Sequence, residues 1–427
     1  MVRTDEFPLP PAPFIRAALK LTTERLASEL AAPQAPSQAP AWSEFEWRVA
    51  MAVAVMHGVS GLLAGRLRWT GPEAWQAFLA EQLQQGRLRQ QRTRQLLADI
   101  DIAAVQAQLP LLGLKGSALL NLRLYAPGER PMSDVDLLCR GPDFEAAGRL
   151  IESLGYEAGA TMWKHREYVP AGIGPDRAFG EHSSNPVKIE LHGRILERLP
   201  MREAEITAQL FPPDAQPGLN PYPSLAALMR HLLLHAAGNV CAQGIRLIHL
   251  HDIAALADRM RADDWDELLR PAASWWMLPP LAFADRCFPG RVSQAALARA
   301  AQACPAHLRR ASARYRLAEH SLSRLSIPMF PGLMWAHSPG EACAWVLSRL
   351  YPGRKAAALS KQIALSQHAL TTTGWAQTSR WEKGLLVLAG SAPRATTLYS
   401  IQRALSYRGD GAASKASSNI ASMRAAL

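Results

Sequence analysis

Two aspartates separated by one residue, Asp134 and Asp136, are the strongest chemical signal in this 427-residue chain. They stand in residues 133–139 (SDVDLLC), whose alternation predicts a strand. On a strand both side chains point to the same face, where their charges repel each other. A divalent cation removes this conflict because it accepts both carboxylates as hard oxygen ligands. The alternative is a polar face of an edge strand, but aspartate is generally depleted in strands.

A third carboxylate, Glu190, lies on a second alternating segment, residues 187–192 (VKIELH). Lys188, Glu190 and His192 share one face of this predicted strand, and apolar residues share the other. If the strand pairs beside the aspartate strand, three carboxylates surround two metal ions. One ion would then organise a triphosphate, and the other would lower the pKa of an attacking hydroxyl. The pattern therefore indicates phosphoryl or nucleotidyl transfer.

A strand, a turn and a helix are predicted ahead of the aspartates. Residues 110–114 are apolar, Lys115, Gly116 and Ser117 interrupt them, and residues 118–124 (ALLNLRL) favour a helix. Glycine lets a phosphate approach the backbone, and the first N–H groups of the helix can donate to it, as can the serine hydroxyl. Taken alone, a Gly-Ser pair at such a position is most often only a turn. The carboxylates that follow favour a phosphate site.

Basic side chains near these segments are candidates for neutralising phosphate charge. Arg130 immediately precedes the aspartate strand, and Arg123 lies in the same insert. Either could contact a phosphate or stack on a base, although Arg123 fits a surface position better. An exposed strand lysine such as Lys188 is ordinarily only solvated. The predicted nucleotide-binding residues are Lys115, Gly116, Ser117, Arg130 and Lys188.

Three segments within residues 111–195, LKGSALLNLRLY, RPMSDVDLLC and VKIELH, together resemble a bacterial nucleotidyltransferase family of the polymerase-β-like superfamily. The resemblance implies an α/β (α+β) fold: a minimal nucleotidyltransferase mixed sheet with flanking helices, followed by a mainly helical domain. It implies catalytic and metal-binding roles for Asp134, Asp136 and Glu190. The implied cofactor is magnesium, or manganese in its place, and the implied substrate is a nucleoside triphosphate. The interval between Gly116 and Asp134 is longer than in the most compact members of the superfamily.

The predicted activity is transfer of a nucleoside monophosphate to a hydroxyl or phosphate of an acceptor. The sequence does not distinguish between four classes of acceptor: a small molecule, a peptide, a protein and RNA. The alternative is a non-catalytic nucleotide- or nucleic-acid-binding protein that has kept the fold. Three intact carboxylates favour the enzyme, because binding alone does not need them.

Helical patterns surround this module. Residues 42–66 predict a helix with a capping box of Ser43 and Glu46, and residues 72–108 predict a long helix. Residues 224–258 predict two helices joined by a short turn, where His231 and His235 have metal-ligand spacing. Packing at a domain interface explains these histidines better, because no glutamate follows the first one. A glycine-rich loop, residues 171–186, is placed to close over a substrate.

We expect four segments: an arm, linker and helix (1–71), the catalytic domain (72–213), a helical domain (214–408) and a basic, flexible tail (409–427). The active site should lie between the catalytic and helical domains. Five scattered cysteines without a CxxC pair fit reduced thiols and a cytoplasmic location. No apolar run approaches the length of a membrane span, and the first residues lack the core of a signal peptide.

The formal net charge of +11 is unevenly distributed. The stretch from Arg354 onward contains ten Lys and Arg residues but only two acidic residues, Glu382 and Asp410. Such a stretch can bind nucleic acid or an anionic membrane surface. A solvated chain end is the stronger interpretation, because the stretch lacks the alternation of aromatic and basic residues that suits base stacking.

Overall fold

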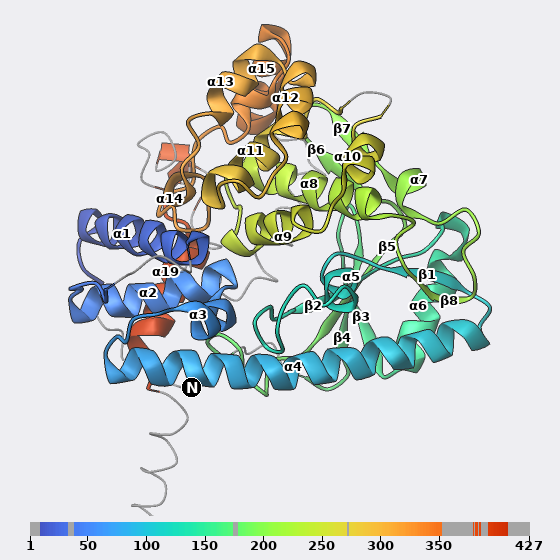
Figure 1. The fold of residues 1–427 in the computed structure, drawn as a ribbon, viewed down its shortest axis with the longest axis horizontal. Coiled ribbons are helices and arrows are strands. Elements are labelled where there is room, and N and C mark those ends of the chain that lie inside the picture. Colours follow the sequence, from blue (N-terminus) through green and yellow to red (C-terminus); the bar gives the residue numbers. More distant parts are fainter. Residues whose placement is uncertain are drawn as a thin grey trace, which may run out of the picture.

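A six-stranded sheet lies at one end of the protein, and helices form most of the remainder (Figure 1). The computed structural model describes residues 9–32, 38–173, 178–270, 273–351, 379, 381–382, 384–385 and 392–408. The predicted tail, residues 409–427, lies outside these ranges, as does most of the basic stretch that precedes it.

The sheet is mixed, as the sequence predicts. In spatial order its strands are β3 (Tyr156–Thr161), β4 (Arg166–Pro170), β5 (Lys188–His192), β2 (Asp134–Leu138), β1 (Pro110–Gly113) and β8 (Gly218–Asn220). β5 runs parallel to β2 and β8 runs parallel to β1, whereas the other neighbours are antiparallel. β6 (Leu196–Arg198) and β7 (Glu203–Glu205) form a separate pair. The fold is therefore α+β, and the strand carrying Glu190 lies directly beside the aspartate strand.

Alternation along β2 and β5 gives this part of the sheet an apolar face and a polar face. The apolar row packs with α4 (Glu73–Gln106) and α6 (Phe144–Ser153) in one hydrophobic cluster. The row consists of Val135, Leu137, Ile189 and Leu191, all fully buried. Burial of each such side chain contributes about 1.5–3 kcal/mol, and a slip of one residue would turn the carboxylates into this cluster. The apolar row thus determines which face the carboxylates occupy.

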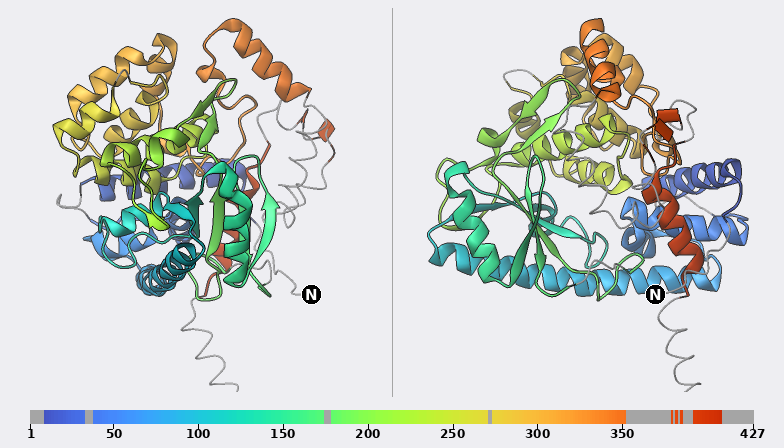
Figure 2. Two further views of the ribbon diagram at one scale, coloured as in Figure 1. Left: turned by 90° about the vertical axis from the view of Figure 1, so that its right-hand side faces the viewer. Right: turned by 180° about the vertical axis from the view of Figure 1, so that it is seen from behind.

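The N-terminal helices pack together with a helix from the far end of the chain. They are α1 (Ala12–Ala31), α2 (Glu44–His57) and α3 (Ser60–Arg66), and α19 (Ala395–Ser406) lies beside α2 (Figure 2). Ser43 and Glu46 form the predicted capping box at the start of α2. The prediction of one helix over residues 42–66 is wrong, because Gly58 adopts a left-handed φ of 67° and ends α2.

α2 and α3 are bent by 113° relative to each other. Only as a bent pair do they reach the length and apolar composition of a membrane span, and most of their apolar side chains are buried in the protein core. Among the described residues, no single helix meets both criteria.

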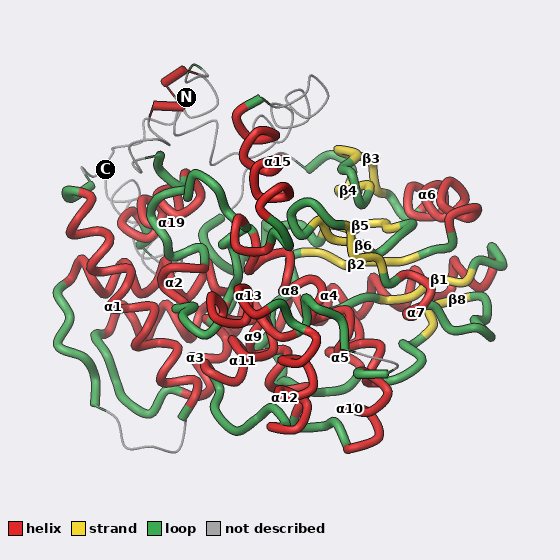
Figure 3. The backbone as a smooth tube through the Cα atoms, turned by 90° about the horizontal axis from the view of Figure 1, so that it is seen from above, coloured by secondary structure: helices red, strands yellow, loops and turns green. Residues whose placement is uncertain are grey.

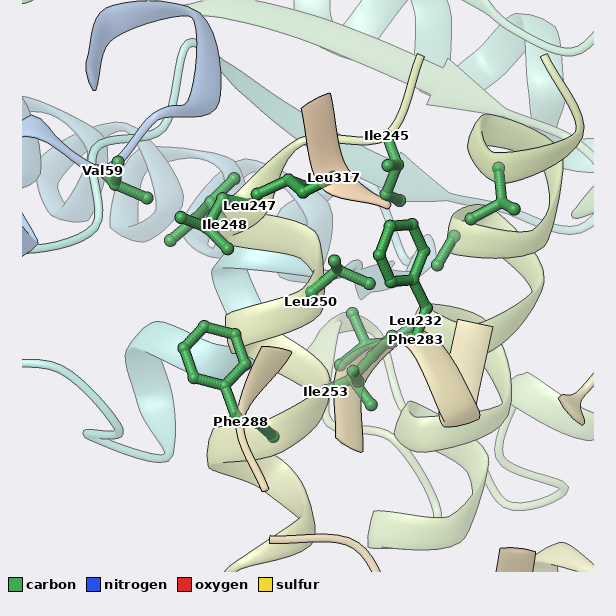
Figure 4. Packing of buried hydrophobic residues seen from close by; sticks show 14 of the residues in the cluster. Val59, Leu232, Ile245, Leu247, Ile248, Leu250, Ile253, Phe283, Phe288 and Leu317 are labelled. Atoms are coloured by element: carbon green, nitrogen blue, oxygen red, sulfur yellow. The ribbon is translucent and has the colours of Figure 1, made fainter. Parts of the chain in front are cut away.

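A second group of helices lies above the sheet in Figure 1 and beside the strands in Figure 3. It begins with the predicted pair α8 (Leu225–Cys241) and α9 (Leu247–Ala257), and the Ser224 hydroxyl caps α8. Leu250 and Ile253 of α9 pack in the same buried cluster as Phe283 of α11 (Figure 4). Further helices in the part of the chain that the structure describes are α5 (Gly116–Asn121), α7 (Thr207–Leu210), α10 (Ala262–Leu268), α11 (Leu278–Cys287), α12 (Gln294–Ala303), α13 (Ala306–Ser312), α14 (Leu317–His320) and α15 (Pro339–Leu350). There are 3₁₀ turns at Gly141–Asp143 and Leu333–Trp335.

A buried histidine joins the two helical groups and predicts a pH-dependent stability. His57 is fully buried; its Nδ1 accepts the Leu247 N–H at 2.8 Å, and its Nε2 lies 2.9 Å from Ser323 Oγ. Burial, with a smaller effect of Arg246, lowers the pKa of His57 to about 3. Below pH 6.5 the unfolded chain therefore binds a proton at His57 that the folded protein does not bind. The free energy of unfolding falls as the pH drops from 6.5 toward 3.

Replacing this histidine should flatten the pH dependence. We expect the free energy of unfolding of His57→Gln to change less steeply between pH 6.5 and 4, by up to ~1.4 kcal/mol per pH unit. Urea unfolding at several pH values measures this slope. His182→Gln, at a half-buried histidine, is the control and should keep the wild-type slope. The same pH dependence of the free energy of unfolding in His57→Gln and wild type would show that His57 does not cause the loss of stability at low pH.

Candidate active site

The three predicted carboxylates share the polar face of neighbouring strands. Asp134 lies opposite Lys188, and Asp136 lies opposite Glu190, in the parallel pairing of β2 with β5. Paired residues on adjacent strands direct their side chains to the same face. The sheet therefore has the strand pairing on which a three-carboxylate site depends.

Asp136 is held by two basic side chains. It is 7% exposed, and its Oδ1 lies 2.7 Å from Lys115 Nζ and 3.1 Å from His192 Nε2. Burial alone would raise its pKa, but the Lys115 ammonium and the hydrogen bond from His192 outweigh burial and hold the pKa well below its usual value. Asp136 is therefore ionised at neutral pH.

Asp134 experiences the opposite balance. Burial and the negative charges of Asp136 and Glu190 raise its pKa to about 6, although Lys115 and Arg246 act against this rise. The carboxylates of Asp136 and Glu190 therefore repel that of Asp134. This repulsion, together with hard oxygen donors on adjacent strands, fits a divalent cation such as Mg²⁺.

The predicted phosphate turn joins β1 to α5 in a strained conformation. Lys115 has a φ of 44°, which costs a residue other than glycine on the order of 1–3 kcal/mol. Its Nζ bonds Asp136, and its backbone N–H donates to Tyr222 Oη at 3.2 Å. The Ser117 hydroxyl is buried and makes no hydrogen bond. The turn therefore places one ammonium and one unpaired hydroxyl beside the carboxylate strand.

Gly116 has no room for a side chain. A Cβ there would lie 2.3 Å from Met132 Sδ and 2.8 Å from Arg130 Nη1. Gly116→Val should displace both side chains and weaken nucleotide binding by tenfold or more, that is, by at least about 1.4 kcal/mol. Titration calorimetry with each nucleoside triphosphate measures this loss. Gly141→Val is the matched control, because nothing lies within 4 Å of a Cβ at that glycine; equal affinities in the two variants would make the Gly116 turn purely structural.

The other two predicted nucleotide-binding residues have acidic partners within the protein. Lys188 forms an ion pair with Glu167 of β4. Arg130 donates two hydrogen bonds, of 2.7 and 2.6 Å, to the Asp252 carboxylate of α9. In this arrangement Arg130 connects the segment before β2 to the helical group.

Helices α8 and α9 border the polar face. His231 of α8 lies 2.7 Å from Tyr222 Oη, the same hydroxyl that the Lys115 N–H contacts. This bond gives His231 the structural role that the sequence favours. Arg246, the N-cap of α9, lies close enough to Asp134 to lower its pKa. The candidate site therefore lies between the sheet and these two helices.

The loop expected to close over a substrate is anchored to α4 in its described part. Arg89, 2% exposed, forms an ion pair with Glu181 and donates to the carbonyl oxygens of Pro186 and Asn185 at 3.1 and 3.2 Å. The Glu181 N–H also donates to the Gln82 side chain. These bonds fix the segment that leads into β5.

The sequence indicates no role for two histidines at the site. Alternation in residues 187–192 places His192 on the face of Glu190 without indicating a function, and no pattern marks His165. His165 Nδ1 lies 3.3 Å from Glu190 Oε2, and His192 Nε2 lies 3.7 Å from the same oxygen. His165 immediately precedes β4, and this position indicates a role only once β4 is known to pair with β5.

The fold and site define an α+β protein with acidic side chains on adjacent parallel strands beside a strand–turn–helix. A model of the family described as uncharacterised nucleotidyltransferase matches residues 43–288, more than half of the chain, and the protein belongs to this family. No curated protein and no solved structure matches the chain.

Proposed function

We propose that the protein transfers a nucleoside monophosphate from a nucleoside triphosphate to a hydroxyl or phosphate of an acceptor, in a magnesium-dependent reaction. The observation that carries this proposal is the register of β2 with β5, which aligns Asp134, Asp136 and Glu190 on one face. Membership of a nucleotidyltransferase family supports the reaction class.

The three carboxylates would hold the magnesium ions. Their oxygens are the hard donors that Mg²⁺ prefers. A cation would also offset the charges of Asp136 and Glu190, which add to burial in raising the pKa of Asp134. When bound, magnesium neutralises charge on the triphosphate and lowers the pKa of the attacking hydroxyl. Manganese fits the same donors.

The residues of the turn would bind and orient the triphosphate. Lys115 Nζ, now on Asp136, can also pair with a phosphate oxygen. Ser117 supplies a free hydroxyl donor. At Gly116 a phosphate would approach the backbone beside Met132 and Arg130, which occupy the space of a Cβ. Arg130 and Lys188 would contribute positive charge from their places at the edge of the site.

Glu190 or Asp136 would accept the proton of the acceptor hydroxyl. The acceptor oxygen then forms a bond to the α-phosphorus as the bond from that phosphorus to the bridging oxygen breaks. The electron pair of the broken bond leaves with pyrophosphate. Both carboxylates lie on adjacent strands, so either can serve without a change of fold.

Labelled nucleotides test this proposal and identify the substrates together. Pure protein is incubated with ATP, GTP, CTP or UTP labelled at the α-phosphate, with magnesium and cell extract. We expect one nucleotide to label a single class of acceptor, separated as small molecule, protein or RNA, and a chelator to abolish the label. Nucleotide binding without any transfer would instead support the non-catalytic alternative.

A further inference from the structure

Two histidines and a glutamate converge at the edge of the polar face. The ligand atoms of His165, Glu190 and His192 all lie within 4.8 Å of one another. Within the described part of the chain, no other three histidine, cysteine, aspartate or glutamate side chains come this close together. The side chains are 12%, 23% and 5% exposed, respectively, so the cluster is largely shielded from solvent.

Strand pairing holds this cluster in place. In the antiparallel pairing of β4 with β5, Arg166 lies opposite Leu191 and Glu167 lies opposite Glu190. The same register continued by one residue places His165 opposite His192, and their ring centroids are 5.1 Å apart. Glu190 and His192 are alternate residues of β5 and share its polar face. The three side chains are thus preorganised by the sheet.

We propose that His165, Glu190 and His192 bind a divalent transition-metal ion, with Zn²⁺ as the best fit. Histidine nitrogen and carboxylate oxygen both bind zinc at about 2.0–2.2 Å, which separates tetrahedral ligands by ~3.4 Å. The separations of 3.3 and 3.7 Å from Glu190 Oε2 to His165 Nδ1 and His192 Nε2 match this value. On binding the ion, His192 Nε2 would give up its hydrogen bond to Asp136 Oδ1. His165 Nδ1 is buried and makes no hydrogen bond, so its lone pair is available to an ion.

The ligand types distinguish this site from the aspartate pair. Imidazole suits zinc and its neighbours, whereas Mg²⁺ prefers oxygen ligands and retains water. Asp136 Oδ1 lies 3.1 Å from His192 Nε2, so the two sites adjoin. A role for this ion in nucleotidyl transfer rests on the proposed function. Binding of the ion to the three side chains does not depend on that function. Glu190 would be shared between the magnesium site and the transition-metal site. With the transition metal bound, the proton of the acceptor hydroxyl would pass to Asp136.

Cobalt is the spectroscopic probe for this site. Metal-free full-length protein is titrated with Co²⁺ without nucleotide, and visible absorption is recorded. We expect one equivalent of Co²⁺ to bind with the bands of a four- or five-coordinate site, and Zn²⁺ to abolish them. His165→Gln and His192→Gln should each weaken binding by at least about 100-fold. His182→Gln, at a half-buried histidine outside the cluster, should bind as wild type does.

A second variant separates this inference from the proposed function. Asp134→Asn should lose transfer yet keep the cobalt spectrum, because Asp134 is not one of the three ligands. X-ray absorption of zinc-loaded wild type should show two imidazoles, which tests the site without any substitution. Zinc surrounded by oxygen alone, or cobalt affinity unchanged in both histidine variants, would overturn the assignment.

Discussion

Asp134→Asn should abolish transfer and leave the protein at least as stable as wild type. The carboxylate is partly buried against Asp136 and Glu190, and these surroundings raise its pKa to about 6. At pH 7 its ionised form therefore opposes folding, and a neutral amide removes that cost. We expect a gain of roughly 1–3 kcal/mol in the free energy of unfolding, measured in chelator at pH 7.

The same substitution removes a predicted magnesium ligand. We expect the turnover number to fall by at least about 10³-fold, the scale on which loss of one charge-stabilising group acts. Asp263→Asn, at an exposed residue of α10, is the control and should leave both rate and stability unchanged. Wild-type turnover by Asp134→Asn under saturating magnesium would remove Asp134 from the catalytic site.

Glu190→Gln should slow the chemical step more than it weakens nucleotide binding. Asp134 and Asp136 stay in place on β2 and would still hold the metal that organises the triphosphate. Glu190 faces the aspartates from β5, where its charge would act on the attacking group. We expect turnover to fall by about 10²–10³-fold, which is the range for loss of a general base or an electrostatic contact.

Two measurements separate rate from affinity in this variant. Single-turnover kinetics give the chemical step, and calorimetry gives the nucleotide dissociation constant, which should change less than about threefold, or ~0.7 kcal/mol. Glu157→Gln, at an exposed glutamate of β3, is the matched control. Equal losses of rate and affinity in Glu190→Gln would place Glu190 in nucleotide binding rather than in the chemical step.

The sequence predicted the polar face because burial constrains a strand strongly. Alternation in β2 and β5 left only one face for Asp134 and Glu190 once Val135 and Ile189 entered the core. The long helix α4 and the pair α8 and α9 followed from composition and capping residues such as Ser224. These predictions rest on the periodicity and capping residues of short segments, which can be recognised in a single sequence.

Features that depend on distant pairing could not be predicted in this way. His165 lies near Glu190 only because β4 pairs with β5. The sequence around these two residues does not indicate that the two strands are neighbours. The sequence predicts that Arg130 contacts a phosphate, whereas its partner in the structure is Asp252 of α9. The break at Gly58 escaped prediction because the residues on both sides favour helix and only the left-handed backbone of the glycine separates them.

The central claim is attack at the α-phosphorus under the control of the strand carboxylates. It is tested most directly by parallel reactions with the preferred nucleotide labelled at the α- or the γ-phosphate, in wild type and in Asp136→Asn. We predict that wild type moves the α-label to the acceptor and releases the γ-label as pyrophosphate, whereas Asp136→Asn does neither. Transfer of the γ-label to the acceptor, or α-label transfer by Asp136→Asn at the wild-type rate, would contradict the account.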